Sequence, residues 1–149
     1  MTIREATVRD IPKLLEFQTQ MAAETEGIAL DEQTVLLGLQ NLLADPAKGK
    51  YYVAEENGEL LGCLMTTYEW SDWRNGQVLW IQSVYVPQPY RCRGTFSNLY
   101  RWVQQMVNND PALRGIRLYV DKRNLRAQQI YEKLGMNGEH YQMYEWMKE

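Results

Sequence analysis

The chain has few of the side chains that a metal site or a disulfide framework needs. Its 149 residues include two cysteines, Cys63 and Cys92, and a single histidine, His140. Two thiols are too few for a disulfide framework and too isolated for a metal cluster, and the histidine has no ligand-type neighbours in the sequence. We therefore expect a reducing, cytoplasmic environment and no structural metal.

Long apolar runs and an excess of positive charge are also missing. No run approaches the ~18–20 residues that cross a bilayer, and residues 1–6 lack the apolar block of a signal peptide. The formal net charge is −3, from 16 basic and 19 acidic side chains, which disfavours a general nucleic-acid binder. We expect a soluble cytoplasmic protein that binds neither nucleic acid nor membrane.

The hydrophobic pattern predicts a mixed α/β protein. A chain of this length suits a single domain, residues 1–149, with a substantial core. Apolar spacing of three and four predicts helices near residues 11–21, 31–43, 94–107 and 124–134. Two Asn-Gly pairs, at 57–58 and 75–76, predict tight reversals between three strands. The expected strands are residues 2–6, 51–55, 60–69, 78–86, 116–120 and 141–147.

The most informative segment is residues 84–96, VYVPQPYRCRGTF. A β-branched strand leads there through two prolines into a basic helix start that contains Gly94. The first N–H groups of a helix have no intrahelical partner and carry partial positive charge, so they bind phosphate readily. Arg91 and Arg93 would add two full charges, and ligands of α/β sheets tend to lie at strand ends. The segment predicts an anion site.

A second informative segment is residues 124–136, NLRAQQIYEKLGM. Asn124 suits a helix N-cap, and Gly135 suits the left-handed cap at the other end. Asn124 and Tyr131 are seven residues apart, close to two turns, so both can face one side with the small Ala127 between them. The pattern predicts a passage for a thin ligand that ends at a phenol.

Together the two segments resemble the GNAT superfamily of acyl-CoA-dependent N-acetyltransferases, and the similarity spans the whole chain. The family signature at the helix start is Arg or Gln, two free positions, Gly, one free position, then Gly or Ala. Arg91 and Gly94 match it, whereas Phe96 stands at the last small position. The downstream run Asn-x-x-Ala-x-x-x-Tyr-x-x-x-Gly follows at the expected separation. The resemblance implies a mixed, mostly antiparallel sheet of about six to seven strands with helices on both faces.

The resemblance also implies acetyl-CoA as cosubstrate. The N–H groups of residues 92–96 would cradle its pyrophosphate, and the backbone of Val84 and Val86 would pair with its pantetheine amides as an added strand. Asn124 would hold the arm, while Tyr131 would lie near the thioester sulfur and assist the departing thiolate. The implied cofactor-binding residues are Val84, Tyr85, Val86, Arg91, Cys92, Arg93, Gly94, Thr95, Phe96, Asn124, Ala127 and Tyr131.

The implied reaction moves an acetyl group directly to a primary amine, which must first lose a proton. Family members often carry an acid on the central strand, but residues 80–83 hold a Gln there, so Glu69 is the first candidate for the base, followed by Glu24 and Glu26. Acids beside aromatics suit a cationic amine, which slightly favours a small molecule over a protein as acceptor. The candidate acceptor-binding residues are Glu24, Glu26, Trp70, Asp72 and Trp73. Core packing explains the two tryptophans equally well.

Other functions fit the same residues. A non-catalytic acyl-CoA sensor or interaction domain would keep the cofactor groove and lack a base, as residues 78–86 do. A phosphate-binding module unrelated to CoA would need only the helix start. Tyr131 also suits a core position, and the two arginines also suit solvated surface charges. An exposed last strand at 141–147 could pair with a second copy to form a homodimer.

Overall fold

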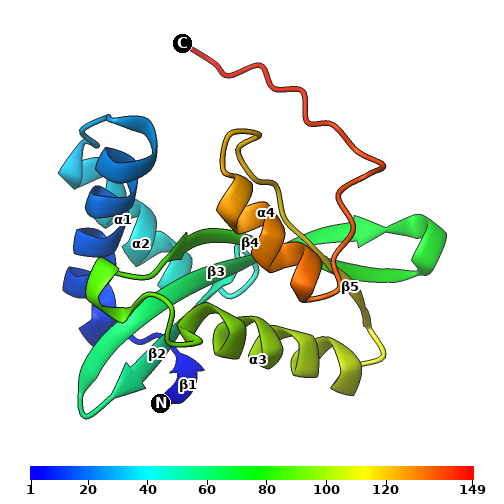
Figure 1. Cartoon of the computed structure of the whole chain (residues 1–149), viewed down its shortest axis with the longest axis horizontal. Coiled ribbons are helices and arrows are strands. Elements are labelled where there is room, and N and C mark those ends of the chain that lie inside the picture. The colour runs from blue at the N-terminus through cyan, green and yellow to red at the C-terminus, as the bar shows by residue number, and fades with distance from the viewer. The chain divides into compact units, whose positions relative to one another are not determined.

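The computed structural model describes residues 1–149, which form two compact units, Met1–Arg117 and Leu118–Glu149. The first unit holds a five-stranded sheet in the order β1-β2-β3-β4-β5 (Figure 1). All neighbouring strands are antiparallel except β4 and β5, which are parallel. The strands are β1 (Thr2–Glu5), β2 (Lys50–Glu56), β3 (Glu59–Ser71), β4 (Gly76–Tyr85) and β5 (Leu113–Arg117).

Three helices of the first unit cover the two faces of this sheet. They are α1 (Ile11–Glu26), α2 (Glu32–Ala44) and α3 (Thr95–Asn109). Apolar side chains of α1 and α2 form one core with every second residue of the strands: Leu14, Phe17, Leu39, Leu42, Tyr51, Val53, Cys63 and Tyr85. Leu99 and Val103 of α3 are fully buried, and α3 begins against Gly62, whose neighbour Cys63 faces α1. Because alternate residues of a strand point to opposite faces, α3 covers the other side.

Caps and turns bound these elements, and α1 continues to Glu26, past the end expected near residue 21. The Asp31 side chain accepts a hydrogen bond from the Thr34 N–H (3.1 Å) and so caps α2. Gly27 ends α1 in the left-handed conformation, with φ 65°. Asn57 and Gly58 form the expected two-residue turn between Glu56 and Glu59. The second reversal is longer than expected: Gly76 already pairs with Ser71, and the loop is residues 72–75, in which Asn75 has φ 47°. The predicted meander of three antiparallel strands is therefore confirmed.

Two details of the predicted sheet are wrong. The strand expected at 116–120 is β5, which begins earlier, at Leu113, and ends at Arg117. Residues 141–147, expected as a last strand, have no regular secondary structure, and Tyr144 and Trp146 are 88% and 87% exposed. Alternating apolar residues form a strand only where a ladder satisfies their backbone groups, and this segment has none here. The sheet has five strands rather than six to seven.

The second unit contains one helix, α4 (Leu125–Lys133).

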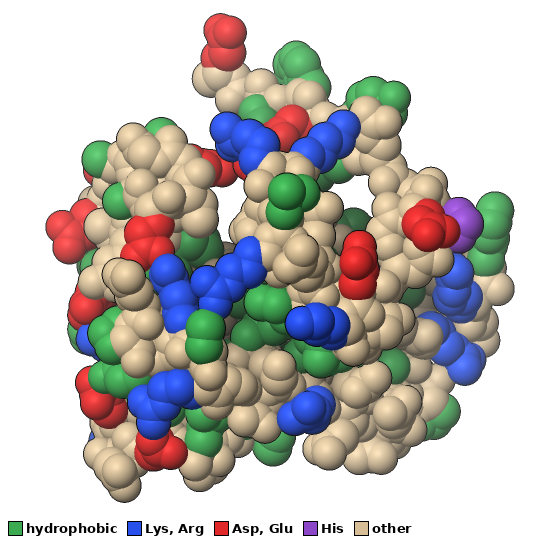
Figure 2. Space-filling model, viewed as in Figure 1, with side chains coloured by type: hydrophobic (Ala, Val, Ile, Leu, Met, Phe, Trp, Pro, Cys, Tyr) green, Lys and Arg blue, Asp and Glu red, His purple; other side chains and the backbone are tan.

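The face of the chain drawn in Figure 2 carries acidic and basic side chains interspersed, without a continuous field of one sign. No helix combines the length and the apolar character that a membrane span requires.

Candidate functional site

The edge of β4 that faces β5 is open over its second half. β5 pairs with β4 only from Gln77 to Trp80, whereas β4 continues to Tyr85. Backbone groups of residues 81–85 on that side therefore have no partner in the sheet. Such an edge can accept an extended ligand that carries amides, because the ligand adds to the sheet like a further strand.

A β-bulge lies within this open half. Cys63 of β3 pairs with Tyr85, and Met65 pairs with Gln82, so Ser83 and Val84 together oppose one residue of β3. Ser83 has φ 51°, a left-handed conformation that serine rarely adopts. The extra residue bends the strand and re-aims its backbone groups, as bulges beside binding sites commonly do.

The strand leads into the loop of residues 86–94, which precedes α3. Cys92 and Gly94 both have positive φ, 60° and 78°, so the chain turns sharply before α3. Gly94 is the N-cap residue, and no side-chain hydrogen bond caps the helix; the start of a helix attracts anions through its N–H groups. The Thr95 hydroxyl donates to the Tyr90 carbonyl (3.2 Å) and closes the loop. The geometry suits the phosphate cradle expected at residues 92–96.

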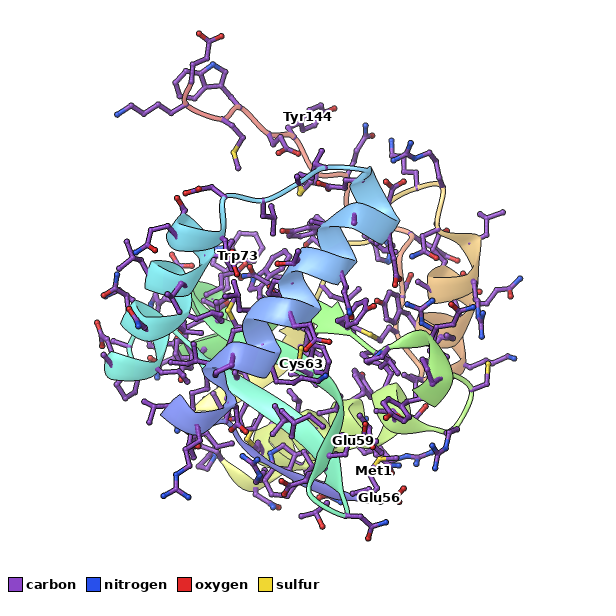
Figure 3. The ribbon with its side chains drawn as sticks, turned by 90° about the vertical axis from the view of Figure 1, so that its left-hand side faces the viewer. Met1, Glu56, Glu59, Cys63, Trp73 and Tyr144 are labelled. Carbon is purple, nitrogen blue, oxygen red and sulfur yellow. The ribbon has the colours of Figure 1, made fainter.

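The two arginines of the loop are not directed at this cradle, contrary to expectation. Arg91 Nη2 lies 2.5 Å from Glu24 Oε2, and its Nε donates to the Val86 carbonyl (2.8 Å). Arg93 Nη2 lies 3.3 Å from Glu56 Oε2. Figure 3 shows Glu56 near Met1, whose amino group lies 3.4 Å from the same side chain. An anion at the cradle would therefore be held first by backbone N–H groups.

Glu24, expected near the acceptor and as a reserve candidate for the base, lies at the loop of residues 86–94. Its carboxylate accepts from the Tyr85 hydroxyl (2.7 Å) and pairs with Arg91, and these two partners, Arg91 first, lower the pKa of Glu24. Burial, followed by the bond to Glu24, raises the pKa of Tyr85 to about 12. The end of α1 is thereby tied to both β4 and the loop. Glu26 lies two residues further on and is exposed.

Phe96 departs from the family signature, and its side chain has a place of its own. The ring lies one helical turn from Tyr100, with 6.3 Å between the ring centroids and an interplanar angle of 40°. Phe96 is partly buried and lies within α3, so its backbone keeps helical geometry. The helix start therefore tolerates a bulky side chain at this position.

Glu69, the expected base, lies far along the sheet from the bulge. Trp80 Nε1 donates to Glu69 Oε1 (3.0 Å), and Arg117 donates to the other carboxylate oxygen. Glu69 pairs with Val78, five residues before Ser83, which is roughly 16 Å at ~3.3 Å per residue. A general base must lie within hydrogen-bond reach of its proton, or one water away. Glu69 is therefore out of direct reach of a group bound at the bulge.

The expected acceptor pocket around Glu69 does not form. Glu69 and Trp70 are consecutive in β3, so they point to opposite faces of the sheet. Trp73 lies at the hairpin tip and is 92% exposed. The Asp72 side chain accepts a hydrogen bond from the Trp73 N–H (2.9 Å) and so stabilises the turn in which it lies. The alternation of side chains along β3 therefore places Glu69 and Trp70 on opposite faces, and they do not form one pocket.

Gly62 positions the site but was not among the residues predicted from the sequence. A Cβ at Gly62 would lie 3.0 Å from the Tyr85 carbonyl oxygen and 3.1 Å from side-chain atoms of Thr95 and Val86. The end of β4 and the start of α3 thus approach the sheet closely only because position 62 has no side chain. A glycine inside an otherwise apolar strand is the signal that could have revealed this approach.

In the second unit, α4 has both of its predicted caps. Asn124 Oδ1 accepts from the Ala127 N–H (3.1 Å), which confirms the N-cap and leaves the side-chain NH₂ group for a ligand. At the other end, the Met136 N–H donates to the Tyr131 carbonyl (3.0 Å), and Gly135 has φ 88°. Tyr131 is partly buried, and this burial raises its pKa above the ordinary value for tyrosine.

Comparison with known proteins identifies the family. Residues 11–136 match the family described as the acetyltransferase (GNAT) family. The chain belongs to the GNAT acetyltransferase family. A solved structure described as a possible acetyltransferase from Clostridium difficile is 43% identical, with a TM-score of 0.92, covering 99% of this chain and 97% of the other. The mixed α/β GNAT fold expected from the resemblance is thereby confirmed.

More distant members show the same fold with different substrates in their names. An aminoglycoside antibiotic 6'-N-acetyltransferase from Acinetobacter haemolyticus is 16% identical, with a TM-score of 0.79 and 99% of each chain covered. A ribosomal-protein-alanine N-acetyltransferase from Brucella melitensis is 14% identical, with the same TM-score, covering 99% of this GNAT chain and 100% of the other. No curated protein sequence matches the chain significantly.

Proposed function

We propose that this GNAT protein transfers an acetyl group from acetyl-CoA to a primary amine by direct attack in a ternary complex. The observation that carries the proposal is the open edge of β4, which runs through the bulge into the uncapped start of α3. The edge suits the amides of an extended arm, and the helix start suits a diphosphate. CoA contains these two groups in this order.

Each part of the cosubstrate has residues assigned to it. Backbone N–H groups from Cys92 to Phe96 hold the pyrophosphate, and the backbone from Val84 to Val86 pairs with the pantetheine amides. Asn124, Ala127 and Tyr131 keep the roles that the family motif gives them along the arm. When bound, acetyl-CoA supplies an acetyl thioester to the site. The chain's own residues align the arm, orient the amine and stabilise the leaving sulfur.

Tyr131 acts as a hydrogen-bond donor to the sulfur. Burial raises the pKa of its phenol above the ordinary value, so the hydroxyl keeps its proton throughout the neutral range. A thiol has an ordinary pKa near ~8.5, so the phenol is too weak an acid to protonate the thiolate fully. Stabilisation by a hydrogen bond remains available throughout the neutral range.

The acceptor amine loses its proton to water in this proposal. Residues 78–85 of β4 contain no acid, and the Gln82 side chain donates to the Thr67 hydroxyl (2.6 Å). Glu69 is held by Arg117 and lies far from the bulge. Without a dedicated base, turnover should rise with pH until the bound amine is neutral.

A non-catalytic acyl-CoA sensor is the second candidate, and the absence of an acid on β4 is the observation that favours it. Thiol release from acetyl-CoA across a panel of amines separates the two functions. The panel contains aminoglycosides, polyamines and alanine-terminated peptides, because the structural neighbours include enzymes named for the first and last classes. Turnover with any amine supports the enzyme, and CoA binding without turnover supports the sensor.

The location of the cosubstrate is tested by Gly94→Glu, which places an anion against the pyrophosphate and should abolish CoA binding. Gly58→Glu is the matched control, since Gly58 has the same φ of 78° and open space around it. The control introduces the same charge and the same backbone strain on a hairpin. Equal CoA affinity in the two variants would place the cofactor elsewhere.

A further inference from the structure

The β4 bulge rests on a buried polar cluster, made of Gln18, Tyr51 and Cys63, that has no part in the mechanism proposed above. Cys63 is fully buried beside α1 (Figure 3), and its thiol donates to the Ser83 carbonyl (3.6 Å). The Tyr85 N–H donates to the same sulfur, and Gln18 Nε2 approaches it from α1 at 3.9 Å. The sulfur thus bonds to backbone groups on both sides of Val84, where the regular ladder is interrupted.

Tyr51 supports the bulge from the next strand. It is 3% exposed, and its hydroxyl is hydrogen-bonded to the Ser83 side chain. Burial raises the pKa of Tyr51, so this hydroxyl remains protonated at neutral pH. Ser83 is therefore held at both ends, with its carbonyl on the Cys63 thiol and its side chain on the Tyr51 hydroxyl.

These bonds explain how a serine keeps a left-handed backbone. Such a conformation is unfavourable for a residue with a side chain and persists only where its surroundings over-determine it. Without this support Ser83 would no longer be fixed in the left-handed conformation, and the backbone groups of Ser83 and Val84 would lose their set direction. The polar cluster thus determines where these groups point.

We propose that Cys63 and Tyr51 are positioning residues of the acetyl transfer, because they lock the Ser83–Val84 bulge and so aim its backbone groups at the acyl end of the bound arm. This inference rests on the proposed function. Neither side chain touches the cosubstrate, and both act through the bulge. Their loss should lower kcat while leaving the affinity for CoA nearly intact, because the phosphate cradle lies further along the chain.

The test uses Tyr51→Phe and Cys63→Val, which remove the polar groups while keeping apolar volume. Tyr52→Phe is the matched control, since it removes the same hydroxyl from a buried neighbour on the same strand whose side chain points to the opposite face of the sheet. Hydrogen exchange at the Ser83 and Val84 amides of the unliganded protein gives a readout independent of activity. We expect exchange at these amides to change, and kcat to fall about tenfold, with the Kd for CoA within about twofold. The Tyr52→Phe control should change neither the amide exchange nor kcat.

Replacing the strained serine provides a rescue. Glycine adopts the left-handed conformation without strain, so Ser83→Gly should make the Tyr51 hydroxyl dispensable. In that background Tyr51→Phe should cost less than about twofold in kcat. Unchanged kcat and exchange in both Tyr51→Phe and Cys63→Val would overturn this inference alone. Wild-type protein that transfers acetyl to no amine would overturn the proposed function, and this inference with it.

Discussion

Gly62→Ala tests the packing that brings the loop of residues 86–94 close to the sheet. The new methyl group would lie 3.0 Å from the Tyr85 carbonyl oxygen and 3.1 Å from atoms of Thr95 and Val86. Thr95 is only 2% exposed, so it has little room to move. The three neighbours lie where β4 ends and α3 begins. Relief of the contact must therefore displace the groups that would hold CoA.

The cost follows from two opposing terms. Overpacking by one methyl group costs about 1–3 kcal/mol, while replacing glycine by alanine recovers about 0.4–1 kcal/mol of unfolded-state entropy. A net destabilisation of about 1–2 kcal/mol lowers the Tm by about 2–8 °C in a protein of this size. If half of that strain is relieved by displacing the loop, CoA binds about two- to fivefold more weakly.

Gly115→Ala is the control, because Gly115 also lies inside a strand but a Cβ there meets nothing within 4 Å. Thermal unfolding and calorimetric titration with CoA measure both effects in the two variants. We expect Gly115→Ala to match or slightly exceed the wild-type stability and to bind CoA normally. Equal Tm and equal CoA affinity in the two variants would refute the close approach at Gly62.

Three further changes test other parts of the structure. Asp10→Asn breaks a paired contact with Arg4 (2.8 and 3.0 Å) and should cost about 2 kcal/mol at pH 7. Because Arg4 lowers the pKa of Asp10 in the folded state, the contact stabilises fully above the ordinary pKa of Asp, ~3.9, and urea titrations should show the difference from wild type closing as the pH falls through the lowered pKa of Asp10. Glu24→Gln frees the loop arginine and should tighten CoA binding up to about fivefold at low salt, less at high salt, whereas Glu26→Gln should not. Tyr131→Phe should lower kcat and leave the affinity for CoA unchanged. If the variant releases thiol from acetyl-CoA as fast as the wild type does, Tyr131 has no part in the mechanism.

Local signals in the sequence predicted the elements that position the site. The Asn57-Gly58 turn, the Asn124 cap and the left-handed Gly135 form as expected, whereas the second reversal is a longer loop that ends at Asn75. Each depends on residues within a few positions of one another, where backbone sterics and short hydrogen bonds decide the outcome. The helix start at Gly94 belongs to the same class.

The contacts that set the chemistry of the site join distant parts of the chain. Arg91 pairs with Glu24, 67 residues away, and this pairing follows from the packing of α1 on β4 rather than from any local pattern. The bulge at Ser83 is also invisible locally, because an extra residue changes which side chains share a face without changing composition. The opposite directions of Glu69 and Trp70, in contrast, follow from strand periodicity alone.

Titration of isotope-labelled protein with CoA, followed through its backbone amide resonances, tests the proposed cofactor site most directly. The account predicts the largest shifts at the amides of residues 92–96 and along the open edge of β4 around Val84, with Gly58 and the β3–β4 hairpin tip unaffected. Saturable shifts confined to other residues, or no shifts at all at millimolar CoA, would contradict it.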